Sequence, residues 1–509
     1  MYKYDQSARC AGPGWGNLMA KLFRANEKNP LWVTSLSERM NYYLYFCGQN
    51  MIYTFVTSFL TAALMFELGS RSLGIVAGIT LAVKVWDAVN DAIFGVIFDK
   101  VHFRSGRRFL PWIKISLFAI PATTILLFTM PHGASDAVKL VWYAVAYMLW
   151  DTAYTFCDAP IFGLVTAMSE RLDERTTLQS NKSIWSGVGT GLSTIIGTIL
   201  ASEGVGLNYS LISVIVAVIA LGTMLPLMKT AKERYPGQMD ENFTVRKMLR
   251  YLVHNKYLLI FFLGQLFYSS LELTRHLNLF VSYYLFNNSN FSLIITGLSA
   301  VPMLIFALLV PKLAKRFDKI RIMQVSALGV FAMDTVTWLF GWQNAVLFVV
   351  LSILRYIPIG LVGVLLSMFT PDCAEYGRFK SGIDAKGITF SIQTFMSKLT
   401  QAFAQAIVFV MFLVIKWNDV SSAKNFDQLK NLAIQQSDGT LKGLWFMYMM
   451  FPAIGALIAA GVWTRYKLKE NDVQLITDVN TGKSTRAEVL PQLSIKDEFA
   501  AELDPVAKA

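Results

Sequence analysis

The stretch Lys84-Val-Trp-Asp87-Ala-Val-Asn90-Asp91 places polar side chains inside an apolar segment that extends over residues 73–98. An apolar segment of that length is typical of a membrane-spanning helix, which needs about 20 mostly apolar residues. Ionisable side chains are costly in the hydrocarbon core, so they face the interior of a helix bundle or a water-filled cavity. This stretch therefore predicts an all-α, polytopic membrane protein with a polar interior.

The composition of the 509-residue chain agrees with that fold class. Hydrophobic residues make up 54% of it and charged residues only 16%, whereas soluble domains are about 25% charged. The net charge of +12 is typical of Lys and Arg in cytoplasmic loops, and no separate basic stripe points to nucleic acid. The four cysteines lie far apart without a CxxC motif, and no nucleophile–base pair is visible. We therefore expect neither an enzyme nor a bound cofactor or structural metal.

Twelve apolar segments are long enough to span a membrane, and they form two sets of six. They lie near residues 42–66, 73–98, 112–130, 139–168, 184–203, 209–228, 258–286, 292–311, 323–341, 345–370, 388–415 and 444–464. Lys and Arg are concentrated in alternate loops, and the positive-inside rule then puts both termini in the cytoplasm of a cell-membrane protein.

This pattern divides the chain into five parts. We expect a cytoplasmic N-terminal segment (1–40), an N-terminal six-helix bundle (41–228), a central cytoplasmic loop (229–257), a C-terminal six-helix bundle (258–466) and a cytoplasmic tail (467–509). The tail is polar and lacks a long apolar run, so we expect it to be mostly disordered or loosely helical.

A weak repeat relates the two halves. Gly95-Val-Ile-Phe-Asp99-Lys100 follows the second span and precedes Arg107 and Arg108, and a similar sequence ending in Asp318-Lys319 follows the eighth span. Carboxylates and guanidinium groups in such loops can hold helix ends together. The repeat supports two related six-helix halves, although a basic cytoplasmic loop is also what the positive-inside rule requires.

The second span carries a candidate cation site. Asp87 and Asp91 are four residues apart and so share one helix face, and Asn90 adds a carbonyl oxygen beside them. Two carboxylates and a carbonyl suit a small monovalent cation, and if the carboxylates instead share a proton, one of them stays protonated. The alternative is a buried structural ion network in which Lys84 and Lys398 neutralise the carboxylates.

The fourth span carries a candidate substrate site in the sequence Trp150-Asp151-Thr-Ala-Tyr154-Thr155-Phe-Cys-Asp158. The spacing of three and four residues puts Asp151, Tyr154, Thr155 and Asp158 on one helix face. A carboxylate that accepts hydroxyl hydrogen bonds, next to an aromatic ring, is a common way to hold a sugar. Ordinary helix packing would explain Tyr154 equally well, but it would not explain Asp158.

The remaining interior charges lie in the second half of the chain. Lys398 in the eleventh span needs a counter-charge, and the carboxylates of spans two and four are the candidates. A further group contains Glu272, Arg275, His276, Asp334 and Arg355. We expect Glu272, Arg275 and His276 to form a structural or gating network, and the alternative is that His276 relays protons.

Four segments taken together resemble the glycoside–pentoside–hexuronide:cation symporters of the major facilitator superfamily. They read Trp86-Asp87-Ala-Val-Asn90-Asp91, Tyr154-Thr155-Phe-Cys-Asp158-Ala-Pro160, Asp372-Cys-Ala-Glu375-Tyr376-Gly377 and Gly387-Ile-Thr-Phe-Ser391-Ile-Gln393-Thr394-Phe-Met-Ser-Lys398. The resemblance extends from about Asn41 to Lys467. It implies two six-helix halves that rock around a site at the midplane.

The resemblance also implies roles for individual residues. The cation would bind at Asp87, Asn90, Asp91 and Thr155, and the substrate at Asn50, Lys84, Tyr154, Asp158, Phe162, Gln393 and Thr394. Asp151 and Lys398 would form the coupling network, and the gating residues would be Asp99, Arg107, Arg108, Lys182, Asp372 and Glu375. Some members have an aspartate on the first span where this chain reads Gly48-Gln49-Asn50, which argues against assuming an α-galactoside.

The sequence thus predicts a symporter that imports a sugar or glycoside with Na⁺, Li⁺ or H⁺. Its partners would be the sugar, the cation and membrane lipid. The alternative within transporters is a proton-coupled carrier of a non-sugar substrate, such as an exported drug. A non-transporting membrane sensor would keep the fold without the polar set Asp87, Asn90, Asp91 and Thr155.

Overall fold

The computed structural model describes residues 32–499 apart from 102, 104–105, 132, 236–250, 343 and 383–385. Within these residues it is built from helices. The first half contains α2 (Leu36–Glu67), α3 (Leu73–Lys100), α4 (Leu110–Phe128), α5 (Asp136–Met168), α6 (Leu172–Ala201) and α7 (Tyr209–Thr230). The second half contains α9 (Lys256–Ser270), α10 (Thr274–Phe286), α11 (Phe291–Arg316), α12 (Lys319–Phe340), α13 (Ala345–Leu366), α14 (Phe369–Ser381), α15 (Lys386–Val414) and α17 (Asp438–Trp463). Shorter elements are α16 (Phe426–Asn431), α18 (Glu470–Asn480), α19 (Arg486–Val489) and the 3₁₀ turns η1 (Ser70–Ser72), η2 (Leu490–Gln492) and η3 (Lys496–Phe499).

The helix boundaries follow from capping residues in the sequence. Ser35 and Glu38 form a capping box at the start of α2. Asn208, Asn255 and Asn344 each accept a hydrogen bond from a backbone amide in the first turn of α7, α9 and α13. Such caps satisfy amide groups that would otherwise lack a partner where a helix begins.

The predicted fold class, an all-α membrane protein, is confirmed. Among the described residues, eight helical stretches are long and apolar enough to cross a membrane. The count of twelve spans and the cytoplasmic position of the termini stay predictions. Most of the predicted central loop (229–257), namely residues 236–250, is outside the described residues.

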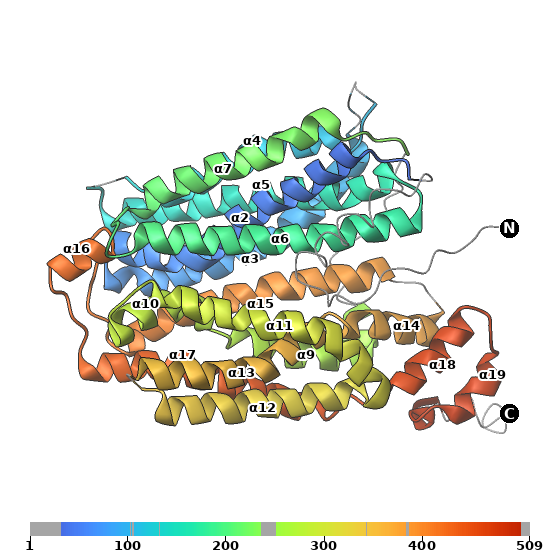
Figure 1. Ribbon diagram of the computed structural model, residues 1–509. Coiled ribbons are helices and arrows are strands. Elements are labelled where there is room, and N and C mark those ends of the chain that lie inside the picture. Colours follow the sequence, from blue (N-terminus) through green and yellow to red (C-terminus); the bar gives the residue numbers. More distant parts are fainter. Residues whose placement is uncertain are drawn as a thin grey trace, which may run out of the picture.

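Two helix bundles lie side by side, one above the other in Figure 1. In the first bundle α2 packs against α6 and α7, and in the second α12 packs against α13 and α17. The two bundles meet along α3 and α15, which are the helices that carry the polar stretch around Asp87 and the lysine Lys398.

Loops of the two halves touch at one end of the molecule, opposite the end where α18 lies (Figure 1). The backbone amide of Ser289 donates to Glu203 Oε1 over 3.0 Å. Phe66 and Phe426 pack edge to face with their ring centroids 5.2 Å apart. We call these four residues the loop seal. Toward the other end the two bundles diverge in Figure 1.

The segment predicted as one span over 258–286 is interrupted in its middle. Helix α9 ends at Ser270 and α10 begins at Thr274. Glu272 lies in the interruption and accepts hydrogen bonds from the amide and hydroxyl of Thr274. This carboxylate therefore satisfies the first amide of α10 and stabilises the break.

The tail was expected to be mostly disordered or loosely helical, and residues 470–499 form short helices that pack against the second bundle. Helix α18 and the turns after it bury Ile476, Val489, Leu493 and Phe499 in the core that also contains Tyr257. The apolar residues of the tail are too sparse for a membrane span, but they are sufficient for this packing because the adjacent end of the second bundle supplies a complementary apolar surface.

Candidate functional site

Two ion pairs connect three helices at the centre of the molecule. Lys84 Nζ on α3 lies 2.8 Å from Asp151 Oδ1 on α5, and Lys398 Nζ on α15 lies 3.1 Å from Asp87 Oδ1 on α3. Lys84 thus donates to a carboxylate of the neighbouring helix rather than to Asp87, which lies three residues later on its own helix. Each of the two lysines thus neutralises one carboxylate, which compensates the burial of these charges.

The predicted cation ligands gather next to this network. Asn90 Nδ2 on α3 donates to Thr155 Oγ1 on α5 over 2.8 Å, and both side chains are buried. Asp87 lies one turn before Asn90 on the same helix. The side chain of Asp91 lies outside the described residues. Carboxylate, amide and hydroxyl oxygens are the ligands that hard cations take.

A cavity of about 310 Å³ lies against the face of α5 that carries Asp158. We call it the Asp158 cavity. Asp158 accepts a hydrogen bond from Gln49 Nε2 over 2.9 Å, and the Tyr154 hydroxyl donates to Gln49 O over 3.0 Å. The lining includes most of the predicted substrate residues: Asn50, Tyr154, Asp158, Phe162 and Thr394. Gln393 is not among the described residues that line it.

Lys182, which was predicted to be a gating residue, lines the Asp158 cavity. Helix α6 begins at Leu172, well before the predicted span at 184, so Lys182 is three turns inside the helix. Its ammonium group lies 4.0 Å from the ring centre of Phe162 and 4.6 Å from that of Phe46. It therefore adds a positive charge to the wall that holds Asp158.

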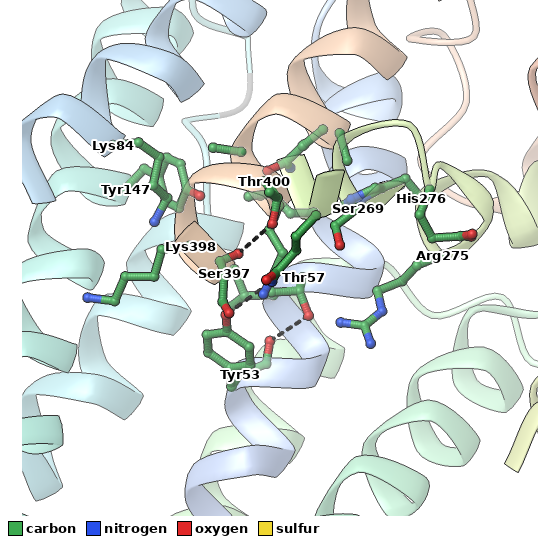
Figure 2. Close-up of a pocket in the computed structure, with 18 of the residues that line it drawn as sticks. Tyr53, Thr57, Lys84, Tyr147, Ser269, Arg275, His276, Ser397, Lys398 and Thr400 are labelled. Atoms are coloured by element: carbon green, nitrogen blue, oxygen red, sulfur yellow. Dashed lines mark hydrogen bonds between the residues drawn. The ribbon is translucent and has the colours of Figure 1, made fainter. Parts of the chain in front are cut away.

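A second cavity of about 270 Å³ adjoins the first, and we call it the Lys84 cavity. Figure 2 shows Lys84, Tyr147 and Lys398 on one side of it. It shows Ser269 and His276 on the other side. The two cavities share Tyr53, Ser397, Lys398 and Gln401. Lys398 therefore lines both cavities and also contacts the carboxylate of Asp87.

Sequence reasoning missed several lining residues. Gln49 contacts Asp158, and Tyr53 donates to Gln401 Oε1 over 3.0 Å across the two halves. Polar residues spaced by four along α2, at 49 and 53, and along α15, at 397 and 401, carry a signal for this face. That signal was overlooked because neutral polar side chains are common in spans.

The other predicted gating residues bind the ends of helices. Lys319 Nζ lies 2.6 Å from Asp372 Oδ2 and 2.9 Å from Glu470 Oε2. Asn480 Nδ2 donates to Glu375 Oε2 over 2.8 Å. Asp372 and Glu375 thus hold α12 and the tail helix α18 beside α14.

The predicted gate in the first half is described only in part. The backbone amide of Arg108 donates to Glu233 Oε2 over 2.6 Å, which ties the start of α4 to the segment after α7. Arg107 is exposed, and the side chain of Asp99 lies outside the described residues.

The interior charges of the second half form two groups. Arg355 Nε donates to Asp334 Oδ1 over 2.7 Å, and both side chains are fully buried. This pair lines neither cavity within the described residues. Glu272, Arg275 and His276 line the Lys84 cavity from the interrupted helix.

The known proteins to which this chain is similar are transporters. The sequence model of a family described as MFS/sugar transport protein matches residues 43–470. An isoprimeverose transporter of Lactiplantibacillus pentosus is 25% identical over 87% of this chain and 91% of its own length. A putative glycoside/cation symporter, YagG, of Escherichia coli K12 is 20% identical over 83% of this chain and 90% of its own length.

A solved structure shares the fold. The crystal structure of the nucleoside transporter NupG superposes with a TM-score of 0.56 at 16% identity, over 85% of this chain and 99% of that one. At this level of identity the likeness concerns the arrangement of the helices alone.

Proposed function

We propose, since the chain belongs to the MFS/sugar transport protein family, that it is a symporter coupling a sugar or glycoside to a monovalent cation. Membership makes it a multi-pass transporter of the cell membrane rather than an enzyme, and it agrees with the resemblance to the glycoside–pentoside–hexuronide:cation symporters. The coupling, the ion and the individual site residues belong to the proposal.

The position of Lys398 carries this proposal. Its ammonium group is 3.1 Å from the Asp87 carboxylate, and the residue lines both cavities. A cation or a proton that binds at Asp87 competes with the ammonium group for the same oxygen atoms. Lys398 would then be free to turn toward the substrate, so that cation binding raises the affinity for sugar. Linkage requires the sugar to raise the affinity for the cation by the same factor.

The Asp158 cavity has the chemistry of a sugar site. Asp158 can accept hydrogen bonds from hydroxyl groups, and the Lys182 ammonium group can donate them. The ring of Tyr154, beside Trp150 and Tyr53, provides an aromatic surface for the apolar face of a sugar. The site between Asp87, Asn90 and Thr155 would hold Na⁺, Li⁺ or H⁺.

The architecture supports transport by alternating access. The eight stretches that could span a membrane come from the described residues alone. Helices α2, α3, α5 and α11 are not among them, and each has 26 or more residues. With these four included, the protein would have twelve spans and cytoplasmic termini. The loop seal would then close the outer side, and the two halves would rock around the central site.

The test is uptake into proteoliposomes of a panel of radiolabelled sugars, each with an inward gradient of Na⁺, Li⁺ or H⁺. We expect concentrative uptake of one sugar with one cation. Replacement Asp87→Asn should abolish accumulation against a gradient, whereas Asp438→Asn, at a side chain that is 81% exposed, should not. Concentrative uptake that survives Asp87→Asn would contradict the cation assignment, and inactivity toward every sugar would contradict the substrate class.

A further inference from the structure

The carboxylate of Asp87 has two lysines near it that could neutralise it. Lys84 is three residues before Asp87 on α3, and that spacing brings two side chains of a helix within reach of each other. Lys398 belongs to the other half of the molecule and contacts Asp87 across the interface between the halves. One of the two ammonium groups therefore always stays near Asp87, whereas the other leaves if the halves move apart.

In the described part of the chain, only the second of these ion pairs is formed. Lys398 Nζ is 3.1 Å from Asp87 Oδ1. Lys84 Nζ is instead 2.8 Å from Asp151 Oδ1 on α5. The ring centre of Tyr147, one turn before Asp151 on the same helix, is 5.6 Å from Lys84 Nζ and adds a cation–π contact. Two groups of α5 thus hold the ammonium group of Lys84.

Helices α3 and α5 are also joined by contacts that do not involve Asp151. Trp86 Nε1 donates to Thr152 Oγ1 over 3.1 Å. Asn90 Nδ2 donates to Thr155 Oγ1 over 2.8 Å. These two hydrogen bonds would keep the helices in register without a carboxylate at position 151. The main consequence of that carboxylate is therefore its effect on the ammonium group of α3.

Loss of the Asp151 carboxylate would change the surroundings of the candidate cation site. A buried ammonium group without a counter-charge is costly, and the Lys84 side chain is only 12% exposed. The ammonium group would then pair with Asp87, which is within reach on the same helix. A cation would have to displace two ammonium groups from Asp87 instead of one.

We propose that Asp151 is a positioning residue that keeps the ammonium group of Lys84 away from Asp87. Of the two lysines, only Lys398 then competes with the coupling cation. This inference rests on the proposed function and gives Asp151 a part in setting the affinity for the cation. Because Lys398 lies on the opposite half, its competition depends on how the two halves are arranged. An ion pair within α3 would not depend on that arrangement, so it would weaken the coupling between cation binding and transport.

The experiment measures the binding of Na⁺ and Li⁺ to the purified full-length protein in nanodiscs by isothermal titration calorimetry. Choline keeps the ionic strength constant, and the pH is fixed. Asp151→Ala should weaken binding of the coupling ion about tenfold, which corresponds to about 1.4 kcal/mol. The double variant that also carries Lys84→Gln lacks both the carboxylate and the ammonium group that it holds. We expect its affinity for the ion to return close to that of the wild type, because the two residues act as a unit.

Two further variants complete the test. Asp151→Asn serves if Asp151→Ala does not fold, and it should also weaken ion binding, because its amide oxygen lacks the charge that holds Lys84. Asp334→Asn is the matched control for loss of a buried carboxylate. Asp334 Oδ1 is 2.7 Å from Arg355 Nε, and Asp334 lines neither cavity within the described residues. This variant should unfold at a lower temperature but keep its affinity for the ion.

Several results would overturn the inference. One is an unchanged affinity for the ion in the Asp151 variants. Another is a double variant that binds the ion as weakly as the single variant, because the loss would then be independent of Lys84. An equal loss in Asp334→Asn would make the effect a general one of removing a buried charge. A wild-type protein that binds neither Na⁺ nor Li⁺ would also overturn the inference, whereas the proposed function fails only if no sugar is taken up with any cation, protons included.

Discussion

Lys398 of the C-terminal half contacts Asp87 of the N-terminal half, with Nζ 3.1 Å from Oδ1. The carboxylate is almost fully buried, and the ammonium group is 23% exposed. Removing one partner of such a pair leaves an uncompensated charge in a nonpolar environment, which costs about 3–5 kcal/mol. The pair therefore has the geometry of a contact that a cation could replace.

Replacement Lys398→Met should make the protein more dependent on the coupling cation. In the variant, a cation at Asp87 would supply the charge that the ammonium group supplies in the wild type. We expect a lower unfolding temperature without Na⁺ or Li⁺, and a larger increase on adding the coupling ion than the wild type shows. The measurement is thermal unfolding in detergent with Na⁺, Li⁺ or choline.

The matched control is Lys442→Met, because Lys442 pairs with Asp438 on an exposed helix surface, at 68% and 81% exposure. Exposed pairs contribute little to stability, so this variant should behave like the wild type. If the effect of the cation is the same in Lys398→Met and in the wild type, Asp87 does not bind it.

Replacement Phe426→Ala should open the loop seal. Phe426 is fully buried between Phe66 of the first half and Tyr283 of the second, with ring centroids 5.2 Å and 5.0 Å away. The apolar contact that this ring makes between the halves stabilises the state described here. Loss of the ring removes that contact and so destabilises this state. A shift of 1.4 kcal/mol would change the ratio of the two states tenfold.

The populations can be measured with spin labels at Val205 and Leu432, two exposed positions at this end on different halves. Double electron–electron resonance should show an additional longer distance in Phe426→Ala. Phe340→Ala, at a 62% exposed position on the surface of α12, should leave the distances unchanged. If the two variants give the same distribution, the loop seal does not control access.

The tail should detach at acidic pH. Glu498 accepts hydrogen bonds from Tyr257 and Tyr376 and pairs with Lys256 Nζ at 3.0 Å. Burial raises the pKa of Glu498, but the hydrogen bonds from Tyr257, Lys256 and Tyr376 outweigh it and lower the pKa below the ordinary value of 4.5. A lowered pKa in the docked state means that docking is stabilised above pH 4.5. This contribution is lost as the pH falls through the docked value.

Hydrogen exchange of residues 470–499, corrected for the intrinsic rate, should therefore be slow at neutral pH and accelerate below about pH 4.5. Glu498→Gln should remove this pH dependence and weaken protection at neutral pH. Asp497→Asn is the control, because Asp497 is the exposed neighbour of Glu498 in the same turn. Equal protection in both variants at neutral pH would show that Glu498 does not anchor the tail.

The sequence was sufficient to place the helices because the membrane fixes their length. Helix α3 covers the predicted span 73–98, and α7 covers the predicted span 209–228. Pairing between helices could not be predicted in the same way. Lys84 has a carboxylate three residues away, yet it donates to Asp151, because the packing of α3 against α5 brings that group nearer.

Contacts between distant segments explain the other differences. Glu498 and Tyr257 are 241 residues apart, and nothing local in the tail indicates that partner. The interruption at Glu272 also has no local signal in the sequence, since a single apolar span is the simplest interpretation of residues 258–286. The candidate substrate residues were easier to find, because a carboxylate such as Asp158 within a span has few structural explanations.

The sharpest test of the packing concerns two glycines on one helix. A Cβ atom at Gly189 on α6 would overlap the carbonyl oxygen of Cys47 on α2 and lie 2.9 Å from the carbonyl carbon. Backbone atoms cannot turn away as side chains do, so Gly189→Ala must push the two helices apart. Overpacking of this kind costs about 1–3 kcal/mol. It would also lengthen the hydrogen bond from Asn50 Nδ2 to Ser186 Oγ, which is 3.0 Å here.

Gly191 is on the same helix two residues later, and a Cβ atom there would meet nothing within 4 Å. Gly191→Ala should therefore leave stability unchanged or raise it by up to about 1 kcal/mol, because alanine favours a helix more than glycine does. Thermal unfolding of both variants measures the difference, and sugar binding should weaken only in Gly189→Ala, since Asn50 lines the Asp158 cavity. Equal unfolding temperatures for the two variants would mean that α2 and α6 do not approach as closely as described.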